Sequence, residues 1–227
     1  LRYYLTINAP EQRDTEFTWA DFIARNNNEL VATWGNLANR ALTFTAKHFD
    51  GTIPAPAGLE QEDQAMLAKV EEGFQTVGEL LSKCKIKAAL GEVMALARVV
   101  NKYFDERAPW TTIKTDRVRT ATTMHTTLQA VDHIKTMIAP FLPFSSERLH
   151  QMLGYKGSMF GENKIQQRRE EKKSHQCLIF EPSDTPAKWE PTELTAGQKM
   201  GDIGPLFKKL DAKIAEKERA KLGQPQE

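Results

Sequence analysis

Apolar residues recur at steps of three and four along most of the first 154 positions, which predicts a series of amphipathic helices. The predicted helices cover residues 18–49, 60–82 and 116–139, with one more that starts near Ile86 and stops before Pro109, and a shorter one after Pro143 that is closed by Gly154. The connections between them are short, and short connections make consecutive helices antiparallel neighbours. The pattern therefore predicts a helix bundle.

Local signals support several of these boundaries. Thr18 followed by Asp21 is typical of a capping box, in which a hydroxyl and a carboxylate satisfy the first free amides of a helix. Asp50-Gly51 ends the first helix, and Pro109 requires the third to stop before it. Trp34 falls within the apolar stripe of the first helix and is expected in the core.

The remainder of the chain has a different character. Residues 156–176 are polar, 177–180 form a short apolar patch that is either a strand or a packed loop, and 205–222 are expected to form a last, highly charged helix. Lysines and arginines between 164 and 173 are candidates for phosphate contact. Because Glu170 and Glu171 are interleaved with them, a solvated insertion is the favoured interpretation. The fold class predicted is all-α, an antiparallel helix bundle with an irregular C-terminal tail.

Composition narrows the class of protein. Hydrophobic residues make up 40% and charged residues 27% of the 227 positions, which is typical of a soluble globular protein. No apolar run approaches the roughly 20 residues that span a bilayer, so no membrane partner is expected. The chain begins without Met and without a signal peptide, which suggests a fragment or a processed product.

Cysteine, histidine and net charge exclude further classes. Cys84 and Cys177 are isolated and the five histidines are scattered, so neither a disulfide framework nor a metal site is predicted, and a reduced, cytoplasmic compartment is expected. A net charge of +1 does not indicate a nucleic-acid-binding protein. It does not exclude one, since a small reading surface needs only a few well-placed groups.

Signals for catalysis are absent from the sequence. It contains no Gly-rich phosphate loop, no nucleophile elbow and no HExxH motif. Asp132-His133, and His48 with Asp50, are acid–histidine neighbours, but adjacency fixes no geometry. They are interpreted as solvated or capping residues on helix surfaces, and no catalytic residue is predicted.

Three residues are candidates for recognition. Asn36 and Arg40 are four positions apart and share a helix face at the flank of the apolar stripe, so they either present donors outward or bond to a neighbouring loop. Trp110 follows Pro109 at a stiff corner. Its indole either stacks on an unpaired base or closes the end of the bundle core. The pattern alone leaves these alternatives open.

The same residues lie in segments that together resemble methionyl-tRNA synthetases over almost the whole chain. Leu1-Arg2-Tyr3-Tyr4-Leu5 looks like the end of the element D-A-L-R-Y-Y-L. The other matching segments are 14–17 with 21–22 (the entry to the long helix), 25–30 and 35–40 (N-x-E-L and G-N-L-x-x-R), 48–51 (K-x-F-D-G), 108–110 (A-P-W), 140–143 (P-x-L-P) and 204–211 (P-L-F-x-x-I-D). Each motif is weak alone, but their order and spacing are specific.

The resemblance implies a function and a division of the chain. In this family the positions of Asn36, Arg40 and Trp110 meet the CAU anticodon of methionine tRNA, the Trp by stacking and the other two by hydrogen bonds. Residues 1–17 would end the stem-contact region that joins the catalytic domain, and 18–154 would be the anticodon-binding bundle. Residues 155–204 would be an irregular insertion, and 205–227 would pack back toward the catalytic domain. ATP with magnesium, and zinc, are expected in the catalytic part and not in this fragment.

Two rival functions remain. The bundle could be the anticodon domain of a sister class I synthetase for valine, isoleucine, leucine or cysteine. Alternatively, it could be a helical scaffold that has lost RNA binding. A free-standing enzyme is disfavoured because the sequence holds no catalytic constellation.

Overall fold

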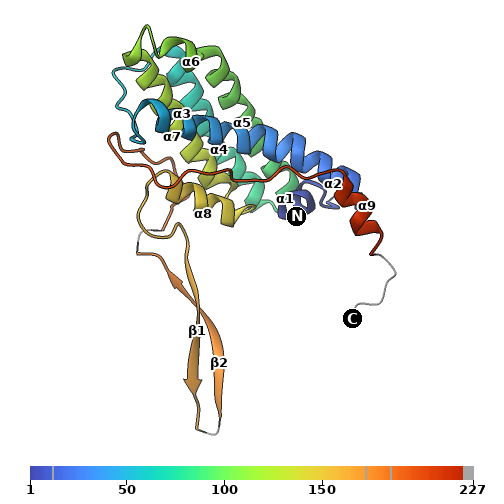
Figure 1. The fold of residues 1–227 in the computed structure, drawn as a ribbon. Coiled ribbons are helices and arrows are strands. Elements are labelled where there is room, and N and C mark those ends of the chain that lie inside the picture. Colours follow the sequence, from blue (N-terminus) through green and yellow to red (C-terminus); the bar gives the residue numbers. More distant parts are fainter. Residues whose placement is uncertain (12, 172, 185, 222–227) are drawn as a thin grey trace.

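The computed structural model describes residues 1–11, 13–171, 173–184 and 186–221, which form a helix bundle with a β-hairpin projecting from it (Figure 1). Three long helices make the centre of the bundle: α4 (Gln61–Ser82), α5 (Ile86–Arg107) and α7 (Arg117–Ile138). They lie side by side and antiparallel, as the short connections predicted. Their observed bounds agree with the predicted ones to within one or two residues.

The middle helix, α7, is buried on nearly every side. Met124, Leu128 and Ile134 are fully enclosed, together with several threonines. The Thr127 hydroxyl donates to the Thr123 carbonyl 2.8 Å away, which satisfies a polar group inside the core. A helix that is enclosed all round shows only a weak one-sided stripe in its sequence.

The predicted first helix is one continuous path with a change of winding inside it. α2 (Trp19–Arg25) runs into a π-helical segment, η1 (Asn26–Gly35), and then into α3 (Asn36–His48). The Thr18 hydroxyl accepts the Asp21 amide at 3.1 Å, which confirms the predicted cap. The Asp21 carboxylate pairs with Arg25 at 3.0 Å instead of reaching back, so the capping box is only half formed.

Shorter helices complete the chain. α1 (Arg2–Ile7) packs beside α5, α6 (Pro109–Thr112) fills the corner between α5 and α7, and α8 (Pro143–Met152) packs on α7. Gly154, with a φ of 89°, follows the end of α8 as predicted. The charged helix expected over 205–222 is shorter, since α9 covers Lys213–Arg219, and residue 222 lies outside the described residues.

A two-stranded antiparallel hairpin corrects the prediction of an all-α chain. β1 (Gly161–Arg169) pairs with β2 (Ser174–Pro182), and Ile165 faces Leu178 in the register. The chain is therefore mostly helical with a small sheet. The hairpin stands away from the bundle, and Ile165 and Leu178 are 70% and 71% exposed. Its strands carry so many polar residues that the sequence indicated an insertion and, at most, one short strand.

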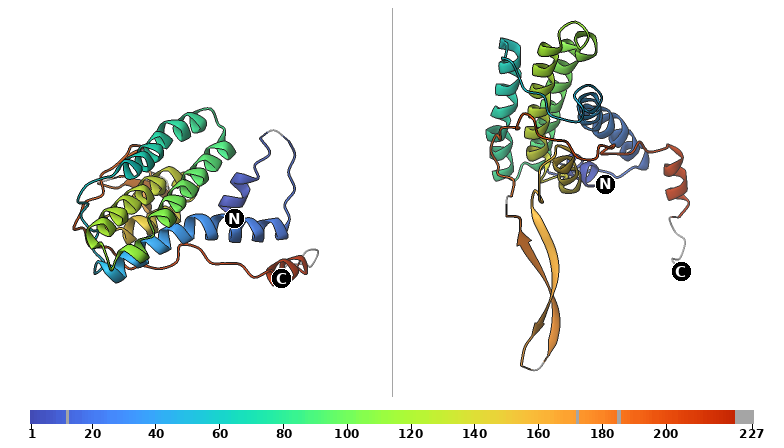
Figure 2. Two further views of the ribbon diagram at one scale, coloured as in Figure 1. Left: turned by 90° about the horizontal axis from the view of Figure 1, so that it is seen from above. Right: turned by 60° about the vertical axis from the view of Figure 1, so that its left-hand side comes forward.

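The segment between the hairpin and α9, residues 186–212, crosses the bundle as an extended strap, visible in both views of Figure 2. The Trp189 indole N–H donates to the Phe74 carbonyl at 3.0 Å, and Leu194 is buried. Farther along, the Met200 amide donates to the Gly51 carbonyl at 2.8 Å. The strap therefore ties the later part of the chain to α4 and to the turn at Gly51, which precede it by more than a hundred positions.

Candidate nucleic-acid interface

The corner between α5 and α6 presents Trp110 to the surface. Ala108 ends α5 with a left-handed backbone (φ 39°, ψ 60°), and Pro109 begins α6 at the position where proline suits a helix. This turn directs the next side chain away from the axis of α5. The Trp110 side chain is 44% exposed, so it does not close the core as one reading of the sequence suggested.

Phe104, one turn before the corner, fills the end of the core instead. It is 1% exposed, and its ring meets Trp110 edge to face, with centroids 5.7 Å apart and an angle of 83° between the planes. Aromatic pairs favour this geometry because the positive edge of one ring faces the negative face of the other. The contact fixes one side of the indole and leaves the rest of it exposed.

Arg40 reaches the same corner from α3. Its guanidinium carbon lies 5.1 Å from the centre of the Trp110 ring and 5.0 Å from that of Phe104. Both distances are within the range of cation–π attraction. One terminal nitrogen, Nη2, donates to the Asp105 carboxylate at 2.7 Å. The bond therefore goes to the neighbouring helix α5 and not to a neighbouring loop, which was the alternative interpretation of the sequence.

The guanidinium remains available for further contacts. The Arg40 side chain is 31% exposed, and among the described residues Asp105 is its one hydrogen-bond partner. Arginine has five N–H donors, so most of them remain free to bind a ligand. Asp105 is itself 57% exposed, and such a surface ion pair holds its partners only weakly.

Asn36 lies one helical turn before Arg40, at the junction of η1 and α3, and is exposed. The preceding residue, Gly35, is buried under the strap: a Cβ there would lie 3.0 Å from Cδ2 of Phe207. The close approach of Phe207 accounts for a glycine at this position. The structure brings Arg40 and Trp110 together and places Asn36 one helical turn from Arg40 on α3.

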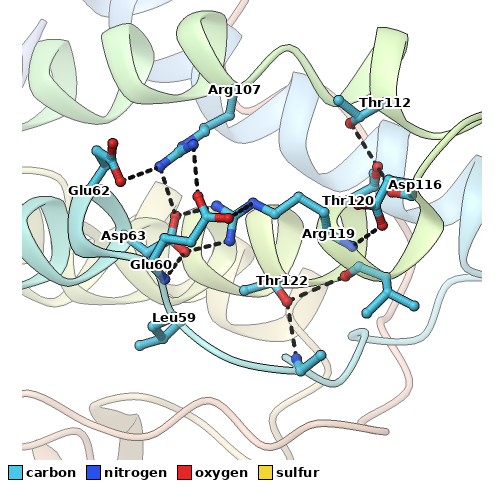
Figure 3. A network of polar contacts seen from close by, with 12 residues as sticks. Leu59, Glu60, Glu62, Asp63, Arg107, Thr112, Asp116, Arg119, Thr120 and Thr122 are labelled. Atoms are coloured by element: carbon cyan, nitrogen blue, oxygen red, sulfur yellow. Dashed lines mark hydrogen bonds and ion pairs between the residues drawn. The ribbon is translucent and has the colours of Figure 1, made fainter.

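A buried carboxylate network lies behind this corner (Figure 3). Asp63, in the first turn of α4, is fully buried and accepts the Tyr103 hydroxyl at 2.6 Å and Nη1 of Arg119 at 2.7 Å. Burial alone would raise the pKa of Asp63, but the hydrogen bonds from Arg119, Tyr103 and the Glu60 amide outweigh it, so the net pKa shift is downward. The carboxylate is therefore charged at neutral pH. Nothing in the sequence around Asp63 had singled it out beyond an acidic residue at a helix start.

The structure corrects the interpretation of Asp132 with His133, and it places the basic residues of 164–173 far from the corner. Asp132 and His133 are not solvated surface residues, because both are almost fully buried in α7. Asp132 binds Lys135, Tyr155 and Thr192, so the pair serves packing of the strap and of α8. The basic residues of 164–173 that are described lie on the hairpin, at the opposite end of the bundle from α6 (Figures 1 and 2).

Within residues 1–221, apart from positions 12, 172 and 185, no group of three or more His, Cys, Asp or Glu side chains is arranged to hold a metal ion. In the same part of the chain, no helix is both long enough and apolar enough to cross a membrane.

Comparison with known families places the chain among proteins that handle tRNA. Residues 1–42 match the family described as tRNA synthetases class I (M). Residues 53–180, more than half of the chain, match the family described as the anticodon binding domain of methionyl tRNA ligase. The chain belongs to this family of anticodon-binding domains.

Curated relatives agree over nearly the full chain. It is 46% identical over 224 residues to the methionine–tRNA ligase of Thermomicrobium roseum and 48% identical over 223 residues to that of Chloroflexus aggregans. These alignments cover 98% of this chain but 38% and 37% of the relatives, so the chain spans well under half of their length. Crystal structures of Mycobacterium tuberculosis methionyl-tRNA synthetase share the fold. The apo form has a TM-score of 0.74 at 23% identity, over 92% of this chain and 38% of the other.

Proposed function

We propose that Trp110, Arg40 and Asn36 read the CAU anticodon of methionine tRNA on behalf of a methionine–tRNA ligase. The observation that carries this proposal is the half-exposed indole of Trp110, held from one side by Phe104 and from another by Arg40. Membership of the anticodon-binding family supports it independently.

The chemistry of the three residues suits an unpaired loop. Sequence-specific RNA recognition commonly splays bases out, stacks them on aromatic rings and hydrogen-bonds their edges. Trp110 offers a large ring that is already fixed in place, so little entropy is lost when a base stacks on it. Arg40 and Asn36 supply donors and an acceptor on the adjoining face of α3.

The activity of the whole enzyme belongs to the same proposal. The relatives are methionine–tRNA ligases, and the enzyme would join methionine to tRNA using ATP with magnesium. Those steps, and a zinc site, are assigned to the portion of the enzyme that precedes the anticodon-binding bundle. In this division residues 18–154 bind the anticodon, 1–17 and 205–227 face the catalytic domain, and 155–204 are an insertion. The cytoplasm is the compartment proposed for it.

The test is binding of this chain to an anticodon stem-loop carrying CAU and to single-base variants of it, at fixed low salt. We expect a preference for CAU and a loss of about 1–3 kcal/mol for Trp110→Ala, which is the usual contribution of base–aromatic stacking. Trp189→Ala is the matched control, because Trp189 is 39% exposed but lies on the strap against α4. It should bind RNA as wild type does.

Other outcomes select the rivals. A preference for an anticodon of valine, isoleucine, leucine or cysteine would assign the domain to a sister synthetase. Equal binding of all stem-loops, or wild-type binding by a folded Trp110→Ala variant, would contradict the assigned reading surface and support a scaffold.

A further inference from the structure

The two ends of the segment that carries Trp110 converge on one buried carboxylate. Arg107, the last residue of α5, and Arg119, in the first turn of α7, both point at Asp63 (Figure 3). Arg119 binds it with both terminal nitrogens, at 2.7 and 2.5 Å, and Nη2 of Arg107 lies 3.8 Å from it. α6, with its exposed indole, bridges these two anchored ends.

Asp63 also fixes the helix from which it projects. Its Oδ2 accepts the Glu60 amide at 2.9 Å, closing the capping box at the start of α4. The Glu60 and Glu62 carboxylates then bind Arg107 at 3.1 and 3.0 Å. One side chain therefore joins the start of α4, the end of α5 and the start of α7.

The corner that this network supports would not hold its shape alone. Ala108 has a left-handed backbone, which is unfavourable for any residue with a Cβ atom. α6 consists of a single turn, and an isolated turn of helix is unstable in water. Trp110 is 44% exposed, so burial of its own side chain restrains the turn only in part. The restraint has to come from the neighbouring residues, and Arg107 is directly next to Ala108.

We infer that Asp63 is a positioning residue for anticodon reading: through Arg107 and Arg119 it holds the α5–α6 corner so that Trp110 stays against Arg40. This inference rests on the proposed function of Trp110 and Arg40. Asp63 does not touch RNA, because it is fully buried. Replacing it with Asn keeps its size but removes the charge, and the amide offers one acceptor where the carboxylate offers two.

A matched control separates positioning from general stability. Asp132 is also a fully buried carboxylate paired with a cation, Lys135, at 2.6 Å, and it lies toward the other end of α7. Asp132→Asn makes the same chemical change away from the corner. Both variants are expected to lower the unfolding temperature, because each removes the negative charge that a buried or partly buried cation faces.

Two readouts distinguish them. In protein labelled with 5-fluorotryptophan, the ¹⁹F resonance of Trp110, assigned with Trp110→Phe, should shift or broaden in Asp63→Asn and stay unchanged in Asp132→Asn. In binding, the preference of Asp63→Asn for CAU over its single-base variants should fall roughly tenfold, within the range that stacking of one base supplies. Asp132→Asn should keep the wild-type preference.

The inference is overturned if folded Asp63→Asn keeps both the wild-type ¹⁹F resonance and the CAU preference, or if Asp132→Asn alters both to the same extent. If Asp63→Asn does not fold, Tyr103→Phe and Arg119→Lys weaken the same carboxylate less severely and are judged by the same two readouts. If wild type shows no CAU preference, the proposed function fails. The ¹⁹F comparison alone then decides whether Asp63 positions the corner.

Discussion

The guanidinium carbon of Arg40 lies 5.1 Å from the centre of the Trp110 ring, although the two residues come from different helices. Phe104 lies beneath both and is buried. The cation and the indole therefore form a small surface whose parts already contact one another before any ligand arrives. Such a surface loses less entropy on binding than one that must order itself.

The contacts of Arg40 predict that a positive charge alone at this position does not give full affinity for the CAU stem-loop. Arg40→Lys keeps the charge but loses the planar group that stacks on the rings and the fork of donors. We expect its affinity for the CAU stem-loop to fall by about 1 kcal/mol or more, in line with the loss of one charge-assisted hydrogen bond. The unfolding temperature should change little, since the Asp105 pair is exposed.

The measurement is fluorescence anisotropy of a labelled stem-loop. Arg148→Lys is the control, since this exposed arginine on α8 donates to the Pro205 carbonyl, away from the corner. If Arg40→Lys binds CAU as tightly as wild type, Arg40 acts only as a point charge.

The position of Asp105 beside Arg40 predicts that removing its charge changes the salt dependence of RNA binding. Its carboxylate lies 2.7 Å from Arg40 and places a negative charge beside the surface where phosphates would approach. Asp105→Asn should raise affinity for all stem-loops and steepen the dependence of log K on log salt by up to about one counterion. Because the carboxylate also orients the guanidinium, the variant should discriminate less between CAU and its variants. Titrations at several salt concentrations measure both effects, and an unchanged slope would contradict the electrostatic account.

The predictable part of this fold was the part that depends on local pattern. Stripes at helical spacing placed α4, α5 and α7, and Pro109 with Trp110 marked the corner. The Arg40–Asp105 pair was not predictable, because the rotation of α3 against α5 is set by packing between them. Asp63 resembled an ordinary acidic residue at a helix start, and only the approach of α5 and α7 makes it a shared anchor.

Two features that the sequence did not predict, the π-helical winding of η1 and the hairpin, have other causes. The π-helical winding of η1 leaves apolar residues at intervals that still resemble an ordinary helix, so the sequence predicted a regular one. The hairpin pairs polar strands in solvent, where no buried face imposes an alternation of apolar and polar residues. In both places the missing signal is one that packing against a core normally supplies.

The hairpin predicts tolerance to deletion. Its ends lie side by side, since Gly161 faces Pro182 and the Ser183 amide donates to the Phe160 carbonyl. Replacing residues 161–182 with a short Gly-Ser linker should leave the free energy of unfolding within about 0.5 kcal/mol of wild type, as for surface changes away from core contacts. CAU binding should also persist, because α6 is at the far end of the bundle. Urea unfolding and stem-loop titration check this, and a large loss of either would assign the hairpin a role in the domain.

A buried histidine predicts acid sensitivity. His150 stacks on Tyr155 with centroids 4.4 Å apart, and its Nδ1 accepts a hydrogen bond from Lys135 at 3.1 Å. Burial, and to a smaller extent the nearby Lys135 charge, lower the pKa of His150 to about 4, although the Asp132 carboxylate opposes the shift. The folded protein therefore keeps the imidazole neutral.

The direction in which stability changes with pH depends on how His150 is protonated in the folded and in the unfolded protein. Below its ordinary pKa of 6.5, His150 takes up a proton in the unfolded chain but not in the folded one. The contribution of neutral His150 to the free energy of unfolding is therefore fully present above pH 6.5. It declines as the pH falls toward 4, by up to about 1.4 kcal/mol per pH unit. From pH 7 to pH 5, wild type should lose about 2 kcal/mol more than His150→Gln, which cannot titrate.

Urea unfolding of both proteins at pH 7 and pH 5 provides the measurement. His125 is partly buried and its pKa is also lowered, chiefly by burial, but it is present in both proteins, so its contribution cancels in the comparison. Equal losses would mean that His150 binds a proton as readily in the folded protein as in the unfolded one. In that case the Lys135–His150 hydrogen bond could not persist below pH 6.5, because it requires an unprotonated Nδ1.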